Sequence, residues 1–98
     1  MLNDKKKDNN ISDINFLINK FYKINRNFKY LLYEINKINL NLEEDISILF
    51  QIIEQINILI YKKNEKGLNN EETNILKELL ISLNNMYNLI YKKYLCYA

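Results

Sequence analysis

The 98-residue chain contains no proline, no histidine and no tryptophan, and it has one glycine, Gly67, and one cysteine, Cys96. Hairpins and tight turns need residues that accept a positive φ or preset a turn, so this composition argues against a β fold. A single cysteine excludes an intramolecular disulfide and makes a reducing compartment, cytoplasmic or nuclear, the expected location. Isoleucine, asparagine, lysine and tyrosine are abundant instead, and their codons point to an AT-rich genome.

The missing residue types also remove most catalytic chemistry. Without histidine the chain lacks the usual general base, the commonest metal ligand and the Ser-His and Cys-His nucleophile pairs. One cysteine excludes clustered-thiolate zinc sites, and one glycine excludes the phosphate-binding glycine loops. The carboxylate clusters, Glu43-Glu44-Asp45 and Glu71-Glu72, lie where helix N-termini favour negative charge. We therefore expect no enzyme activity, no cofactor, no small-molecule substrate and no metal site.

The first residues are polar and show no apolar periodicity. They contain the one dense basic run, Lys5-Lys6-Lys7, between two aspartates, and they lack the apolar core of a signal peptide. We expect residues 1–11 to be a flexible polar N-terminus ahead of one domain over 12–98. The most apolar stretch is interrupted by Gln51, Glu54 and Asn57, so we expect no membrane span.

From residue 14 onward apolar residues recur at alternating steps of three and four. The series is Ile14, Leu17, Phe21, Ile24, Phe28, Leu31, Ile35 and Ile38. This is the a/d heptad seam by which one helix packs along another. It predicts a helix over about 12–39, with Ser12 or Asp13 as the N-cap.

Two more helices are predicted over about 43–64 and 70–95. Asn41 is a candidate N-cap for the first of them, and Gly67 is suited to the left-handed cap that ends it. Asn69 and Glu72 have the spacing of a capping box. The seams are Ile46, Leu49, Ile53, Ile56 and Ile60, and then Leu76, Leu80, Leu83, Tyr87, Ile90 and Tyr94. The fold class is therefore all-α, with three long antiparallel helices forming a small bundle or a coiled-coil hairpin.

These helices carry more apolar surface than three helices can cover. The second helix has an apolar arc too wide for one neighbour, and tyrosines crowd the end of the third. Contiguous exposed apolar surface marks a binding site for a partner. We predict a non-enzymatic protein–protein interaction subunit of a larger assembly. The candidate interface is Ile48, Ile52, Ile53, Ile56, Leu59, Tyr87, Tyr91, Tyr94 and Leu95.

The sequence also bears on other function classes. The same seams could hold a self-contained homo-oligomeric coiled coil. A peripheral membrane helix needs a basic polar face, and the second helix carries Gln51 and Glu54 there instead. Nucleic-acid binding is not expected, because 14 basic and 12 acidic residues are interspersed and the net charge is only +2.

Two short resemblances suggest a further alternative. Leu31-Leu32-Tyr33-Glu34-Ile35, with Leu42 and Glu54-Gln55, resembles the start of the small MOZART subunit of γ-tubulin complexes. The Gly-x-x-Pro-Glu-Ala-Leu stretch that defines that family is missing. Two stretches, Ile75-Leu76-Lys77-Glu78-Leu79 and Tyr33-Glu34-Ile35, are similar to helices of a small kinetochore coiled-coil subunit. The resemblances imply a spindle, γ-tubulin or kinetochore subunit, and no site residue is transferred from them.

Overall fold

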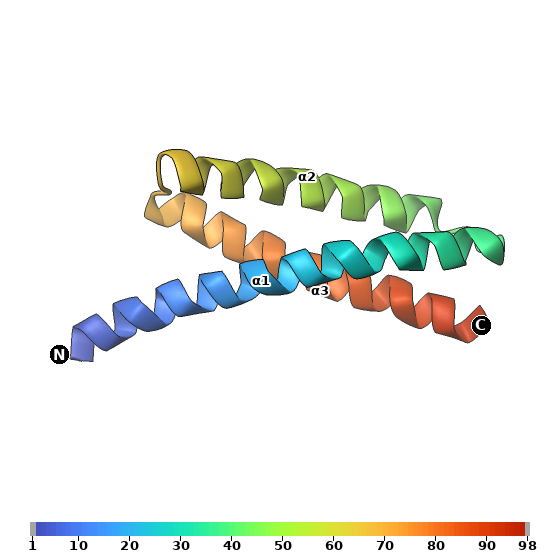
Figure 1. Cartoon of the computed structure of the whole chain (residues 1–98), viewed down its shortest axis with the longest axis horizontal. Helices are drawn as coiled ribbons and strands as arrows, with labels where there is room; N and C mark the ends of the chain where they lie inside the picture. The colour runs from blue at the N-terminus through green and yellow to red at the C-terminus, as the bar shows by residue number, and fades with distance from the viewer. Residues whose placement is uncertain (1, 98) are drawn as a thin grey trace.

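The computed structural model describes residues 2–97, and the side chains of residues 13–97. It contains three helices, α1 (Leu2–Lys37), α2 (Glu43–Glu65) and α3 (Asn70–Tyr97), and no strand among the described residues. The chain runs up, down and up again, so α1 and α3 are parallel and α2 is antiparallel to both (Figure 1). The predicted all-α fold of three long helices is confirmed.

The first helix begins earlier than predicted, at Leu2 instead of residue 12. Ser12 and Asp13 therefore lie inside α1 and do not cap its start, which corrects the predicted N-cap. The prediction placed the start where apolar periodicity begins, whereas the helix continues into the polar residues before it. The side chains of Lys5-Lys6-Lys7 lie outside the described residues, and the flexibility of residues 1–11 stays a prediction.

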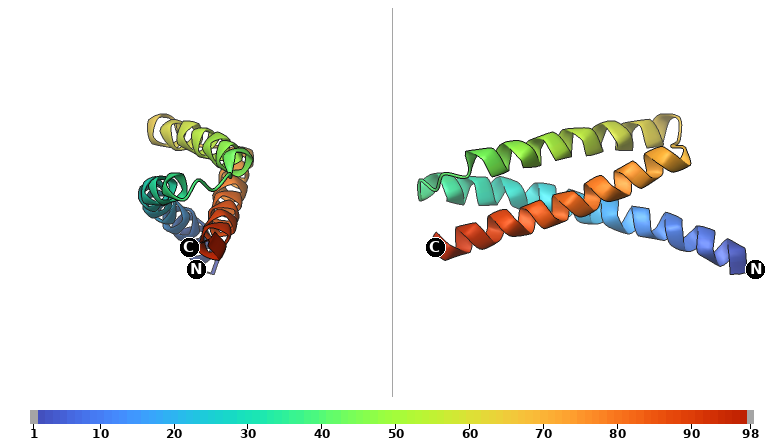
Figure 2. Two further views of the ribbon diagram at one scale, coloured as in Figure 1. Left: turned by 90° about the vertical axis from the view of Figure 1, so that its right-hand side faces the viewer. Right: turned by 180° about the vertical axis from the view of Figure 1, so that it is seen from behind.

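The helices differ in length. At about 1.5 Å per residue, the 36 residues of α1 span about 54 Å and the 23 residues of α2 about 35 Å. The N-terminal end of α1 extends beyond the ends of the other two helices, as Figure 2 shows.

The end of α1 is fixed by a left-handed asparagine. Asn39 has a φ of 55°, a conformation that asparagine tolerates better than other non-glycine residues. The N–H of Asn39 donates to Asn36 O and the N–H of Leu40 donates to Ile35 O, both at 3.3 Å. This is the pairing of a Schellman cap, which satisfies the last carbonyls of the helix and turns the chain toward α2.

The start of α2 differs in detail from the prediction. Leu42, and not Asn41, occupies the N-cap position, and it makes no side-chain capping hydrogen bond. Asn41 still contributes, because its Oδ1 accepts from the N–H of Glu43 at 3.4 Å. Leu42 is buried against the core. Because the Leu42 side chain is buried, the backbone lies close to the core at the residue that caps α2.

The connection from α2 to α3 follows the predicted rules closely. Gly67 has a φ of 81°, and its N–H donates to the carbonyl of Lys63 at 3.1 Å. Asn69 Oδ1 accepts from the N–H of Glu72 at 2.7 Å, and Glu72 Oε1 accepts from the N–H of Asn69 at 3.2 Å. This reciprocal pair is the capping box. The predicted caps at Gly67 and Asn69 are therefore confirmed.

The core follows the heptad seams. Its largest fully buried side chains come from all three helices: Phe21, Ile35, Leu49, Ile56, Leu76, Leu83 and Ile90. Ile38 ends the predicted first seam, and it is exposed because α1 has already ended at Lys37. Ile18, which the seam did not include, is buried.

Helix α3 lies at the centre of the arrangement. Its backbone packs closely against both α1 and α2, whereas no described Cα of α1 comes within 8 Å of a Cα of α2. Two surface ion pairs lie along the α2–α3 contact: Asp45 Oδ2 with Lys93 Nζ at 2.7 Å, and Glu72 with Lys62. Among the described residues, helix α2 therefore has close backbone contacts with α3 and none with α1.

Candidate functional site

The nine predicted interface residues fall into three classes of exposure. Ile56 is completely buried, so it belongs to the core and offers no surface in the folded chain. Ile52, Ile53, Leu59, Tyr87 and Tyr94 are half-buried and pack against the core. Ile48, Tyr91 and Leu95 are exposed. The role of these residues as an interface stays a prediction, and the structure distributes them over separate surfaces.

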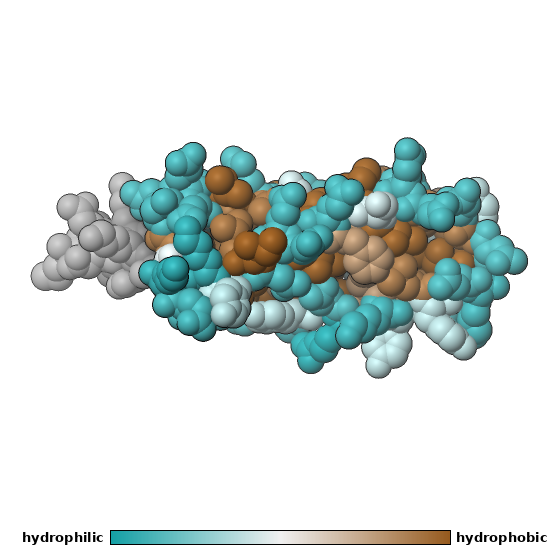
Figure 3. Space-filling model, turned by 90° about the horizontal axis from the view of Figure 1, so that it is seen from above, coloured by the Kyte–Doolittle hydropathy of each residue, from teal (hydrophilic) through white to brown (hydrophobic). Residues whose placement is uncertain are grey.

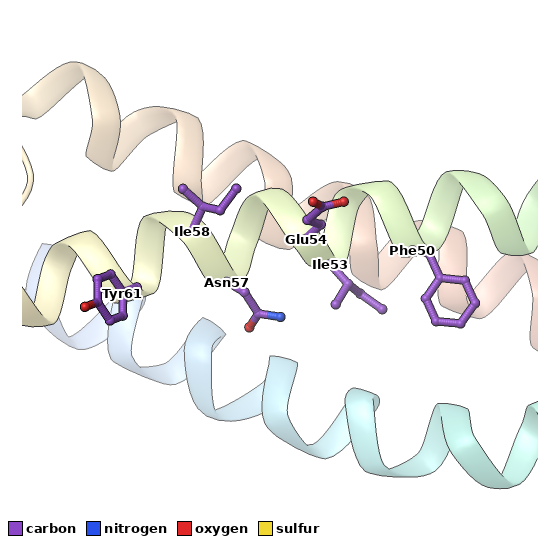
Figure 4. A pocket seen from close by; sticks show the side chains of 6 residues that line it. All are labelled: Phe50, Ile53, Glu54, Asn57, Ile58 and Tyr61. Atoms are coloured by element: carbon purple, nitrogen blue, oxygen red, sulfur yellow. The ribbon is translucent and has the colours of Figure 1, made fainter.

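The first surface is a shallow apolar depression on α2, which we call the α2 face. It has a volume of about 580 Å³ and is lined by Phe50, Ile53, Glu54, Asn57, Ile58 and Tyr61. Figure 4 shows Phe50, Ile53 and Asn57 projecting from α2 on the side along which α1 runs. Of the predicted residues only Ile53 lies on this face.

The α2 face carries large side chains in contact with solvent. Phe50 is 50% exposed, Ile58 is 61% exposed and Tyr61 is 70% exposed. From above, where α2 is nearest to the viewer, apolar side chains gather in a band between polar rims (Figure 3). A contiguous apolar surface of this kind is typical of a binding site.

The position of α1 explains why the α2 face is open. The two helices meet through side chains at Phe28 and Phe50, whose ring centroids are 5.6 Å apart in an edge-to-face arrangement. Large aromatic rings at the contact keep the backbones apart, and α1 and α2 make no close backbone contact. Ile53, Asn57 and Tyr61, which follow Phe50 on the same side of α2, are therefore incompletely covered.

The α2 face has a negative border. Helix α2 carries five acidic and two basic side chains, which gives it a net charge of −3. Glu43, Glu54 and Glu65 are spaced by 11 residues, just over three full turns, and all three are exposed. They form an acidic row along one side of α2.

The second surface is a groove between α1 and α3, which we call the tyrosine groove. It has a volume of about 520 Å³. Four residues come from each helix: Asn27, Tyr30, Leu31 and Glu34 from α1, and Tyr87, Asn88, Tyr91 and Tyr94 from α3. It contains three of the predicted interface residues, and it does not include Leu95.

The aromatic rings of this groove contact one another in series. The rings of Tyr87 and Tyr91 are stacked with centroids 6.2 Å apart, and those of Tyr91 and Tyr94 are 6.3 Å apart. Burial is the main cause that raises the pKa of Tyr87 above the ordinary tyrosine value, and the neighbouring Tyr91 contributes less. Loss of hydration is the main cause that raises the pKa of Tyr94, and the negative charge of Glu34 is the second. Both hydroxyls therefore stay protonated at neutral pH, and that of Tyr94 donates to Glu34 Oε2 at 3.5 Å.

The sequence prediction missed residues on both surfaces. Phe50, Ile58 and Tyr61 on α2 were not assigned to the interface, although Phe50 and Tyr61 stand 11 residues apart on one face. Tyr30 and Glu34 on α1 were not assigned either. Tyr30 and Glu34 are four residues apart, so they share a face beside the first seam. That spacing was the available signal, but it does not reveal which helix faces them.

The described residues offer little for other kinds of site. Within residues 13–97, whose side chains the structure describes, no group of three or more cysteine, aspartate or glutamate side chains is placed to hold a metal ion. Among the same residues no helix is both long enough and apolar enough to cross a membrane. The thiol of Cys96 is exposed and forms no disulfide.

Comparison with known proteins gives no match: no protein-family model, no curated protein and no solved structure is similar to this chain.

Proposed function

We propose that the protein is a non-enzymatic interaction subunit, and that the α2 face binds an amphipathic helix of a partner protein. The observation that carries the proposal is the exposure of Phe50, Ile58 and Tyr61 beside a core that is already filled by other residues. The remaining apolar surface of α2 contributes little to folding of the single chain, and covering it with a partner would be favourable.

The shape of the α2 face favours a helix as the ligand. Phe50 and Tyr61 lie about 16 Å apart along the helix axis, at about 1.5 Å per residue. Between them Ile53 and Asn57 complete a row that follows the axis. Rows of this kind accept the side chains of a second helix, which anchors through residues at i, i+3, i+4 and i+7.

The charge of α2 specifies the partner further. Of the acidic row, Glu54 lines the apolar depression, and Glu43 and Glu65 lie on the same side of α2 beyond its two ends. A partner helix with lysine or arginine flanking its apolar stripe would meet these carboxylates at the rim. Charges at a rim contribute mainly to association rate and orientation, so the apolar contacts supply most of the affinity. An exposed thiol at Cys96 is compatible with a reducing compartment, cytoplasmic or nuclear.

Site-specific crosslinking in the cells of origin tests the proposal. A photoreactive amino acid replaces Ile58 in the full chain, and in a control chain it replaces Ile81, which is 51% exposed on α3. We expect a discrete adduct with another protein from position 58 and none from position 81. Ile58→Ser should abolish copurification of that protein, and the matched Ile81→Ser should not.

Two outcomes would overturn the proposal. Absence of any adduct at position 58 would mean that α2 is not the binding face. An adduct between two copies, together with a dimeric mass by light scattering, would instead establish the homo-oligomer.

A further inference from the structure

The tyrosine groove contains one formal charge, the carboxylate of Glu34. This side chain is half-buried, and the hydroxyl of Tyr94 donates to its Oε2 at 3.5 Å. No lysine or arginine nitrogen of the described residues lies within 4.0 Å of it. The nearest lysine in sequence, Lys37, lies instead over the ring of Tyr33, with Nζ 5.3 Å from the centroid. A carboxylate without a cationic partner is therefore placed among aromatic rings.

The surroundings of Glu34 favour a cation. Tyr87, Tyr91 and Tyr94 form a connected series of rings beside it, and Tyr30 completes the lining from α1. The faces of tyrosine rings carry negative electrostatic potential and attract guanidinium or ammonium groups. The carboxylate and the ring faces both attract a cation, and both repel an anion.

We propose that the tyrosine groove binds an arginine side chain of a partner protein. The planar guanidinium can stack on a tyrosine ring and donate to Glu34 at the same time, which the compact ammonium of lysine cannot do as well. The Oε1 atom of Glu34 accepts no hydrogen bond from the described residues. We therefore assign Oε1 as the acceptor for the guanidinium N–H groups. The side-chain amide of Asn88 lies in the same lining and can pair with the peptide backbone beside the arginine.

This inference goes beyond the proposed function, because it concerns another surface. All residues of the groove belong to α1 and α3, whereas all residues of the α2 face belong to α2. The two surfaces can therefore be tested with separate variants, and failure of one proposal leaves the other intact.

A titration of the purified full chain followed by NMR tests the inference. The probe is a blocked pentapeptide of glycine and serine with one central arginine, and the comparison peptides carry lysine, glutamine or glutamate there. We expect the arginine peptide to shift the side-chain amide signal of Asn88 and the ring signals of Tyr91 and Tyr94. The lysine peptide should bind more weakly, and the glutamine and glutamate peptides should cause no shift at these residues.

Matched variants identify the groups responsible. Glu34→Gln should weaken binding of the arginine peptide about three- to tenfold. Glu54→Gln makes the same change on α2 and should have no effect. Tyr91→Leu should weaken binding about two- to fivefold through loss of the aromatic face, and Tyr61→Leu should not.

The inference is overturned if the arginine and glutamine peptides shift the groove signals equally, or if no groove signal moves. It is also overturned if Glu34→Gln binds as tightly as the unaltered chain, because the charge would then have no part in recognition. Circular dichroism of each variant establishes that the helices are retained.

Discussion

Two isoleucines on α2, two residues apart, should lose very different amounts of stability on the same substitution. Ile56 is 0% exposed and Ile58 is 61% exposed. Replacing Ile56 by alanine removes buried methyl and methylene groups and leaves a cavity among the core residues. Substitutions of this kind cost about 2–5 kcal/mol. A domain of this size has a total stability of about 5–15 kcal/mol, so the loss would be a large part of it.

At Ile58 the same substitution should cost no more than about 0.5 kcal/mol, because the removed groups are mostly in contact with water. Alanine has a slightly higher helix propensity than isoleucine, and this gain applies equally at both positions. The difference between the two variants therefore isolates burial. With about 4–8 °C per kcal/mol, the melting temperature should fall by roughly 8–40 °C for Ile56→Ala and by less than about 4 °C for Ile58→Ala.

Urea and heat denaturation followed by circular dichroism measure both values. Equal losses of stability at the two positions, or a loss below about 1 kcal/mol at Ile56, would refute an orientation of α2 that buries Ile56 and exposes Ile58. The experiment should be repeated at several protein concentrations. A cost at Ile58 that grows with concentration would show that self-association buries this side chain.

Three further predictions concern the connection between α2 and α3. Gly67→Ala should lower the free energy of unfolding by about 1 kcal/mol, because alanine is strained at a φ of 81°. The strain comes from the backbone alone, since no atom lies within 4 Å of the added Cβ. Urea titration would measure this loss. Asn69→Ala should cost about 1 kcal/mol in the same assay because the N–H of Glu72 loses its acceptor, whereas Asn70→Ala should be close to neutral. Glu72→Gln should melt at a lower temperature than the unaltered chain at neutral pH, because the hydrogen bond from Lys62, and then that from the Asn69 N–H, lower the pKa of Glu72. The stability from this shift is fully present above the unfolded-state pKa of about 4.3 and is lost as pH falls through the lower folded-state pKa, so the two melting curves should converge in acid. Equal melting temperatures at neutral pH would contradict this reasoning.

The features that sequence predicted well are those set by neighbouring residues. The capping box needs only Asn69 and Glu72 three positions apart, and the left-handed cap needs only Gly67 after the last turn of the helix. The heptad seam of α1 likewise depends on spacing alone, and its members from Ile14 to Ile35 are buried or packed against the core. Local rules of this kind do not require the relative positions of the helices.

The start of α1 and the surfaces depend on more than spacing. Residues 2–11 carry no apolar period, so nothing in the pattern distinguished helix from a polar tail. Ile56 was assigned both to a seam and to the interface, because a wide apolar arc does not show which part of it a neighbouring helix covers. The tyrosine groove requires the register between α1 and α3, which places Glu34 beside Tyr94 across 60 positions of sequence. No periodic signal encodes that pairing.

The α2 face and the tyrosine groove lie on different helices, yet one buried ring contacts both. Phe28 packs edge-on against Phe50 of the α2 face, and its centroid is 6.5 Å from that of Tyr87 in the groove. Phe28 is almost completely buried, so it cannot shift without moving one of these neighbours. A partner helix that moved Phe50 would press on Phe28, and through it on Tyr87. If the two surfaces are coupled in binding, we expect the coupling to pass through Phe28, and thermodynamic linkage requires it to be equal in both directions.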